Sequence, residues 1–292
     1  MCSMLRRVPD FVVRDCPLCG GSKQTRLFGA RDVNSRVTDE EFTVVRCVCR
    51  MVFLNPVPRD LGRYYPAAYD PHRELAGAPK KPRKGSHRFD RIAAMKPGRI
   101  LDVGCGSGYD LLAMRAKGWE VAGVEMNTQA ASHAREQGLD VRQGTLAEAK
   151  LASESFDVVT LFHVLEHLPD VRSVVQEVAR LLKPGGVMLA QVPNFEGANA
   201  KLFRENWYEL DVPRHVNFFS PATLKAMVGK AALSVASLRW IDSAADFRRS
   251  LKNKYGRTFG AKVARPLLRV TSSVLNLWRT GDMLEVLARR AT

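Results

Sequence analysis

From Gly98 onward, short apolar segments alternate with segments of helical periodicity, and this alternation constrains the fold more than any other feature. Glycine-terminated helical segments such as "GYDLLAMRAKG" and "TQAASHAREQG" separate the apolar ones. Five apolar segments have the length of buried strands: "RILDVG", "EVAGVE", "LDVRQG", "FDVVTLF" and "VMLAQVP". Because strands that alternate with helices form parallel sheets covered on both faces, the sequence predicts an α/β fold with a doubly wound, mostly parallel sheet.

The loop after the first strand is rich in glycine. It contains Gly104, Gly106 and Gly108, and Asp102 lies at the end of the strand before it. Glycines here let backbone N–H groups approach a ligand at the carboxyl ends of the strands. Glu125 ends the next strand, where a carboxylate can accept hydrogen bonds from both ribose hydroxyls. Two ligands fit this arrangement, a dinucleotide and S-adenosylmethionine.

The loop "DVGCGSG" differs from the dinucleotide fingerprint G-x-G-x-x-G, and it resembles the first motif of the class I S-adenosylmethionine-dependent methyltransferases. "ESFDVVTLFHVLEHLPD" and "LLKPGGVMLAQVPN" resemble later motifs of the same family, in unbroken order over about residues 98–240. The resemblance implies a Rossmann-like, seven-stranded methyltransferase domain over residues 98–292. It also implies which residues contact the cofactor. Asp102, Gly104, Gly106 and Gly108 would contact its methionine part, and Phe162 would flank the methionine chain. Glu125 would hold the ribose, and Thr145 and Leu146 would border the adenine.

The stretch "FHVLEHLPD" (162–170) contains H-x-x-E-H, a zinc-protease signature. In such proteases the motif lies within a long helix, whereas here His163 follows an apolar strand and Pro169 comes soon after, so we reject that interpretation. Within the methyltransferases, the stretch resembles the group of ubiquinone-pathway O-methyltransferases and bacterial tailoring and surface-sugar enzymes. Relatives there have a Glu-x-x-Glu-His run and a later histidine, proposed to hold a divalent metal. This chain has His163 in place of the first Glu, and His215 is a later histidine.

O-methylation requires a base for the acceptor hydroxyl, and histidine is the usual base near neutral pH. We therefore predict that His163 or His215 is the general base. The wider prediction is that His163, Glu166, His167 and His215 act as base, metal ligands or substrate orienters. The alternative for Glu166 and His167 is that they only cap and brace the loop.

Four cysteines are spaced as Cys16-x-x-Cys19 and Cys47-x-Cys49. In a cytoplasmic protein this pattern favours metal ligation over disulfides, and four thiolates suit structural zinc. "CPLCG" also resembles the N-terminal zinc unit of some sugar methyltransferases. We predict a zinc-ribbon-like β unit over residues 1–60, with four free thiols as the alternative. A linker or lid over 61–97 follows, in which Tyr64, Tyr65 and Tyr69 either fold over the cofactor cleft or pack a domain junction.

The chain is basic, with 45 Lys and Arg against 30 Asp and Glu and a formal net charge of +15, which favours anionic partners. Residues 247–280 contain nine Lys or Arg and no Asp or Glu. This segment either contacts an anionic membrane surface or a lipid-linked substrate, or forms helices that cover the sheet edge before a last strand, "DMLEVLAR". No apolar run is long enough to cross a bilayer and no signal peptide is recognisable, so we expect a cytoplasmic protein, with peripheral membrane contact through the basic segment.

These features predict an S-adenosylmethionine-dependent enzyme that methylates a hydroxyl on a small molecule, a sugar or a carrier- or lipid-linked metabolite. A nucleic-acid methyltransferase is the alternative that the positive charge suggests. It is disfavoured because no N-P-P-Y-like element follows the fourth strand. A binding or scaffold protein with the same fold is a third interpretation, which the intact glycine loop and Glu125 disfavour.

Overall fold

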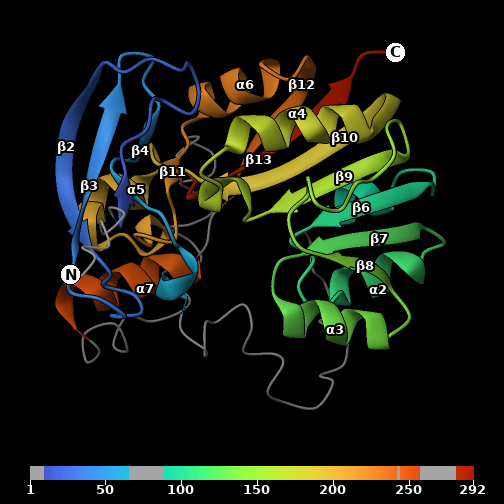
Figure 1. Cartoon of the computed structure of the whole chain (residues 1–292), viewed down its shortest axis with the longest axis horizontal. Coiled ribbons are helices and arrows are strands. Elements are labelled where there is room, and N and C mark those ends of the chain that lie inside the picture. Colours follow the sequence, from blue (N-terminus) through green and yellow to red (C-terminus); the bar gives the residue numbers. More distant parts are fainter. Residues whose placement is uncertain (1–9, 66–88, 242–243, 257–280) are drawn as a thin grey trace, which may run out of the picture.

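The computed structural model describes residues 10–65, 89–241, 244–256 and 281–292, and Figure 1 shows two sheets lying side by side. The larger sheet has seven strands in the order β12-β13-β10-β9-β6-β7-β8. Six of these strands run in the same direction, and β13 runs antiparallel to its two neighbours, β10 and β12. The strands are β6 (Arg99–Val103), β7 (Glu120–Glu125), β8 (Asp140–Gln143), β9 (Phe156–Phe162), β10 (Leu182–Pro193), β12 (Leu233–Ile241) and β13 (Met283–Arg290). The predicted doubly wound, mostly parallel sheet is confirmed, and β13 is the predicted last strand.

Side-chain hydrogen bonds cap the first turns of two helices. Asn127 begins α3 by accepting a hydrogen bond from the Ala130 N–H (2.9 Å), and Asp170 begins α4 by accepting one from Ser173 (3.2 Å). The α-helices are α1 (Asp90–Ala93), α2 (Tyr109–Arg115), α3 (Thr128–Glu136), α4 (Val171–Leu181), α5 (Ala198–Phe203), α6 (Pro221–Gly229) and α7 (Ala244–Tyr255). The described residues also form the short 3-10 turns η1 (Gly62–Tyr64), η4 (Leu165–His167), η5 (Arg204–Asn206) and η6 (Tyr208–Leu210).

Helices cover both faces of the large sheet. In β6, Leu101 belongs to the core under α4 and α6, whereas Ile100 belongs to the core under α1 and α2. Successive side chains of a strand point to opposite faces, so one short apolar strand contributes to two cores. Both residues are completely buried, as the near-continuous apolar character of the segment predicts.

The second sheet is built mainly from the N-terminal residues, in the order β11-β4-β3-β2, and a separate ribbon pairs β1 with β5. These strands are β1 (Phe11–Val12), β2 (Gln24–Arg31), β3 (Glu41–Cys47), β4 (Val52–Leu54), β5 (Val57–Pro58) and β11 (Asn217–Phe218). The edge strand β11 comes from far along the chain and pairs antiparallel with β4. Phe203 and Trp207 lie in the same core as Phe42 of β3. The N-terminal sheet is thus completed by residues that follow β10.

Parts of the predicted organisation fall outside the described residues. Tyr69, most of the predicted linker and the basic segment from Arg257 to Thr280 are among them. The predicted boundaries at residues 60 and 97 therefore stay predictions. The start of the basic segment is described and forms most of α7, which packs through Phe247 against Phe203 (ring centroids 5.3 Å apart). None of the described helices combines the length and the apolar character that a bilayer crossing requires.

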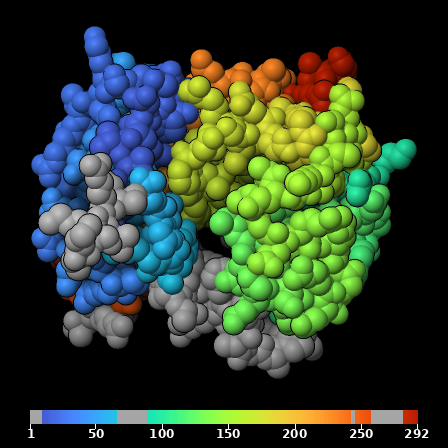
Figure 2. Space-filling model, viewed as in Figure 1, coloured from blue at the N-terminus to red at the C-terminus, as the bar shows by residue number. Residues whose placement is uncertain are grey.

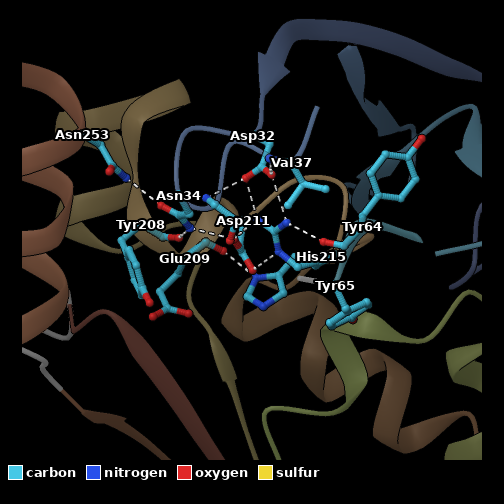
Figure 3. A network of polar contacts seen from close by, with 12 residues as sticks. Asp32, Asn34, Val37, Tyr64, Tyr65, Tyr208, Glu209, Asp211, His215 and Asn253 are labelled. Carbon is cyan, nitrogen blue, oxygen red and sulfur yellow. Dashed lines mark hydrogen bonds and ion pairs between the residues drawn. The ribbon is translucent and has the colours of Figure 1, made fainter. Parts of the chain in front are cut away.

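A buried ion network joins the N-terminal sheet to the segment after β10. Arg214 is completely buried and donates two hydrogen bonds to each of two carboxylates, those of Asp32 and Asp211, with shortest N–O distances of 2.6 and 2.7 Å. Figure 3 shows Asn34 between Asp211 and Asn253 of α7: its side chain donates to the Asp211 carboxylate (2.7 Å) and accepts from the Asn253 amide (2.7 Å). A buried arginine is tolerated only when its charge is fully paired, and here two carboxylates pair it.

The network controls the protonation of Asp211. Burial alone would raise the pKa of Asp211, but the hydrogen bonds and charge of Arg214 outweigh it and lower the pKa to about 2. The carboxylate therefore stays ionised over the whole physiological pH range.

We expect Asp211→Asn to lower the free energy of unfolding near neutral pH, and this difference from the wild type to disappear in acid. The folded-state pKa of about 2 lies below the value of about 3.9 expected in an unfolded chain. The carboxylate thus contributes stability above about pH 4, and the contribution, about 2.5 kcal/mol, is lost as the pH falls towards 2. Urea unfolding of both proteins at a series of pH values measures the effect.

Asp140→Asn is the matched control, because the Asp140 side chain is 56% exposed beside Arg142. The difference in free energy of unfolding between Asp140→Asn and the wild type should be the same at every pH. If the difference between Asp211→Asn and the wild type were also independent of pH, the proposed role of Asp211 would be wrong.

Candidate functional site

The carboxyl ends of the parallel strands β6, β7, β9 and β10 point towards the N-terminal sheet, as the arrowheads in Figure 1 show. In the space-filling view of Figure 2 the surface is hollowed between that blue sheet and the green part of the large sheet. Ligands of open α/β sheets bind at this edge. The candidate site therefore lies where the two sheets face each other.

The three glycines of the loop between β6 and α2 all have positive φ, from 56° to 78°. A Cβ on Gly104 would lie 2.8 Å from the Val164 side chain, and a Cβ on Gly108 would collide with Leu139. A Cβ on Gly106 would meet no atom of the described part of the chain within 4 Å, its two chain neighbours aside. Gly104 and Gly108 thus allow close packing inside the protein, whereas Gly106 borders open space in which a ligand can lie.

Two buried carboxylates flank this loop. Glu125 is 8% exposed and accepts hydrogen bonds from the backbone N–H groups of Gly106 (2.8 Å) and Asn127 (2.7 Å). Asp102 is 5% exposed and accepts a hydrogen bond from the Thr160 hydroxyl (2.6 Å). The Glu125 carboxylate is therefore fixed against the glycine loop, with oxygen lone pairs left for further donors.

The remaining residues predicted to contact the cofactor differ in exposure. Thr145 is exposed and bonds Glu148, whereas Leu146 is 4% exposed and belongs to the main core. Phe162 ends β9, with its ring centroid 5.1 Å from that of Phe89. The contacts predicted for these residues stay predictions, and burial in the core leaves Leu146 little surface for a ligand.

His163 lies directly after β9. Its backbone has φ 56°, an uncommon conformation for a residue with a side chain, and its N–H donates to the Gln191 carbonyl (3.0 Å). Its Nδ1 is 3.3 Å from Oε1 of Glu166. The His163 side chain is 32% exposed, whereas that of Glu166 is 1% exposed. A solvent-accessible imidazole thus rests on a buried carboxylate.

Glu166, His167 and His215 form a second group, in which one potential ligand atom from each lies within 4.8 Å of the others. His167 Nδ1 is 3.1 Å from the Arg214 carbonyl, and His215 Nδ1 is 2.7 Å from the Glu209 carbonyl. Carbonyl oxygens only accept, so these contacts are hydrogen bonds when both Nδ1 atoms carry the proton. Each Nε2 then has a free lone pair, as in histidines that bind a metal.

Electrostatics favour a neutral His167 beside an ionised Glu166. Burial, and then the neighbouring His215, lower the pKa of His167 to about 4, so this ring is neutral at pH 7. Burial would raise the pKa of Glu166, but the surrounding histidines, His163 first, hold it below its usual value. Both carboxylate oxygens of Glu166 are buried, and in the described part of the chain neither makes a well-aligned hydrogen bond; the approach of His163 Nδ1 to Oε1 is long, at 3.3 Å. An ionised, buried carboxylate with so little hydrogen bonding, beside the imidazoles of His167 and His215, suits a bound cation.

One residue that no sequence pattern indicated, Asn217, supports this turn. The Asn217 side-chain amide donates to the carbonyls of Leu165 (3.1 Å) and Leu168 (2.7 Å), one at each end of η4. The Tyr65 hydroxyl lies 2.9 Å from His167 Nδ1. Of the tyrosines predicted to form a lid, Tyr65 alone among the described residues contacts the histidines, because Tyr64 is buried in the N-terminal core.

The four cysteines of the N-terminal unit come together in space. The sulfur atoms of Cys16, Cys19, Cys47 and Cys49 all lie within 4.8 Å of one another. The Cys16–Cys49 and Cys19–Cys47 sulfurs are 3.5 Å apart, too far for disulfides. Four thiolates around tetrahedral zinc, each about 2.3 Å from the metal, lie a little under 4 Å apart, so the cluster is compatible with zinc.

The cysteine cluster also contacts the segment that contains the histidines. Arg172 of α4 donates to the Leu18 carbonyl between the first two cysteines (2.8 Å), and Arg14 donates to the Pro169 carbonyl (2.9 Å). Cys16 and Cys47 lie in the same core as the apolar face of α4. The N-terminal unit therefore packs against the segment from Pro169 to Arg172.

Comparison with known proteins agrees with this arrangement. A family described as a methyltransferase domain matches residues 71–238, more than half of the chain. The ubiquinone biosynthesis O-methyltransferase of Hahella chejuensis is 35% identical over 167 residues, which cover 52% of this chain and 69% of that protein. The protein of the same name from Paracidovorax citrulli is 43% identical over 123 residues, covering 39% of this chain and 50% of that protein. The chain thus spans between about half and two thirds of these relatives.

Among solved structures, a SAM-dependent methyltransferase from Archaeoglobus fulgidus aligns with 75% of this chain and 97% of its own, with a TM-score of 0.53 and 18% identity. At this identity the similarity establishes the fold alone. Together with the family match, it shows that this chain belongs to the methyltransferase domain family and contains a class I S-adenosylmethionine-dependent methyltransferase domain.

Proposed function

We propose that the chain transfers a methyl group from S-adenosylmethionine to a hydroxyl oxygen of a small-molecule, sugar or carrier- or lipid-linked metabolite. The observation that carries the proposal is the half-buried His163 resting on the buried carboxylate of Glu166 at the carboxyl end of β9. The names of the two O-methyltransferases also support an oxygen acceptor. S-adenosylmethionine supplies an electrophilic methyl group when it is bound.

In this proposal His163 takes the proton of the acceptor hydroxyl through a ring nitrogen. The hydroxyl oxygen forms the new bond to the methyl carbon, and the old carbon–sulfur bond breaks with its electron pair on sulfur. Glu166 would stabilise the imidazolium that forms on His163, since a carboxylate beside a histidine favours the charged ring. His163 then returns the proton to solvent, to which its side chain is open.

Glu166, His167 and His215 are the residues that would hold a divalent metal. The buried Glu166 carboxylate, approached by His163 at 3.3 Å but without a well-aligned hydrogen bond in the described part of the chain, and the Nε2 atoms of His167 and His215 fit such an ion. A metal there would supply positive charge for an acceptor oxygen. If His215 has no metal to bind, it is the alternative base.

We further propose that Cys16, Cys19, Cys47 and Cys49 bind one structural zinc ion. Its role would be to fix the N-terminal loops that contact residues 165–172 through Arg14 and Arg172. This proposal is independent of any metal near His167.

We expect Glu125→Ala to weaken binding of S-adenosylhomocysteine by at least about 20-fold, because the variant loses a fixed charged acceptor for two ribose hydroxyls. Calorimetric titration measures the affinity. Glu120→Ala is the matched control, since Glu120 lies on the same strand with its side chain 69% exposed and should bind as the wild type does. Equal affinities of the two variants would show that Glu125 does not hold the ribose.

We expect about one zinc ion per chain in the purified protein, and little zinc in Cys19→Ser or Cys49→Ser, because each removes one of four ligands. Both variants should also melt at a lower temperature, since a structural metal stabilises only the folded state. Cys105→Ser is the control and should keep its zinc, because Cys105 lies in the glycine loop. Mass spectrometry of the metal content decides the question, and less than half an equivalent in the wild type would refute the site.

We expect His163→Ala to lower kcat at least about 100-fold with a panel of phenols, hydroquinones and sugars, because it removes the base. Affinity for S-adenosylhomocysteine should stay within about threefold, since the cofactor contacts are elsewhere. His133→Ala, a change of the same kind on α3, is the control and should retain activity. A loss confined to His215→Ala would assign the base to His215, and full activity of both variants would exclude histidine as the base.

A further inference from the structure

A second cavity lies away from the glycine loop and the histidines. It has a volume of about 440 Å³, within the range of small-molecule pockets. It opens between strands β2 and β3 of the N-terminal sheet and the segment from Phe195 to Arg204. Its lining residues include none of those predicted to contact S-adenosylmethionine or to act as the base.

Positive charge is concentrated at this cavity. Arg46 of β3, Lys201 of α5 and Arg204 of η5 all line it and are exposed. None of the three makes an ion pair or a side-chain hydrogen bond with another residue in the described part of the chain. The one acidic lining residue, Glu196, is 3.9 Å from Arg50 outside the lining. Three unpaired cations therefore face one cavity with little opposing charge.

The apolar part of the lining is aromatic and held in place. Phe195 and Phe28 both line the cavity and are half-buried. The ring of Phe195 contacts that of Phe218 (centroids 5.6 Å apart) and that of Trp207 (6.3 Å). A fixed aromatic ring with one open side is a surface on which a flat ligand ring can stack.

Two irregularities of the backbone shape this cavity. The pairing of β2 with β3 shifts between Arg26 and Phe28, so Leu27 is an extra residue, and both Leu27 and Phe28 line the cavity. In a regular strand they would point to opposite faces. Arg204 has φ 49° and ψ −118°, a conformation costly for any residue with a Cβ. Such strain is typical of ligand sites.

We propose that this cavity binds a nucleotide, with its phosphates on Arg46, Lys201 and Arg204 and its base against Phe28 and Phe195. A nucleoside diphosphate has about three negative charges near neutral pH, which match the three cations. Arginine and lysine on phosphate oxygens form charge-assisted hydrogen bonds, and the aromatic rings bind the base regardless of its identity. The proposal does not depend on the reaction at His163.

The test is calorimetric titration of the full chain with uridine diphosphate, in the presence of saturating S-adenosylhomocysteine so that the methyltransferase site is filled. We expect saturable binding that the triple change Arg46→Gln, Lys201→Gln and Arg204→Gln weakens more than about tenfold. The triple change Lys117→Gln, Lys225→Gln and Lys230→Gln removes the same charge from exposed lysines elsewhere and should leave the affinity within about twofold. Melting curves check that each variant is folded.

A second pair of measurements tests the aromatic part. Phe28→Leu should weaken the affinity for uridine diphosphate about three- to tenfold and leave the affinity for pyrophosphate unchanged, since only the base stacks on the ring. Absence of saturable uridine diphosphate binding, or equal losses in the two triple variants, would overturn the proposal. So would pyrophosphate binding as tight as that of uridine diphosphate. The proposal would also be overturned, in favour of a lipid headgroup, if the protein bound phosphatidylglycerol vesicles but no nucleotide and the first triple change weakened the vesicle binding.

Discussion

The buried pairing of Arg214 with Asp32 and Asp211 is the interaction on which the rest of the structure depends. Placing a guanidinium in the protein interior has a large desolvation cost, and only full pairing offsets it. The first carboxylate comes from the N-terminal sheet and the second from the loop after η6. The two parts of the chain therefore cannot separate without leaving buried charges unpaired. The network thus strongly favours a single relative position of the two parts.

This constraint also sets the geometry of the histidines. The carbonyl of Arg214 accepts the hydrogen bond that orients His167, and His215 is the next residue along the chain. One residue further, the Val216 carbonyl accepts a hydrogen bond from Arg14 and the Val216 N–H donates to the Glu166 carbonyl. A continuous backbone segment thus links the ion network to both imidazoles, and positions fixed in this way are what a catalytic site requires.

Local patterns in the sequence were sufficient for the large sheet, because each strand and helix is marked by its own residues. The alternation from Gly98, the glycine loop and Glu125 predicted the parallel sheet and its cofactor edge. The pairing of Asp32 with Arg214, the placement of β11 beside β4 and the contact of Tyr65 with His167 could not be predicted, since each joins residues at least about 100 positions apart without a local signal. The close packing of Gly108 against Leu139 could not be predicted either, since it depends on a residue of the connection between α3 and β8.

The loops around the cysteine cluster contact the segment that follows η4. A metal-bound loop far from the candidate site would add only stability, but here the Leu18 carbonyl accepts a hydrogen bond from Arg172 and Arg14 donates one to the Pro169 carbonyl. From the opposite direction, Asn217 bonds both ends of the same turn while it forms the edge strand of the N-terminal sheet. Contacts from the N-terminal sheet therefore help to position Glu166 and His167, in addition to the strand β9 that precedes them. Because these contacts hold the turn that contains Glu166 and His167, the N-terminal sheet is a structural part of the candidate site and not an appendage to it.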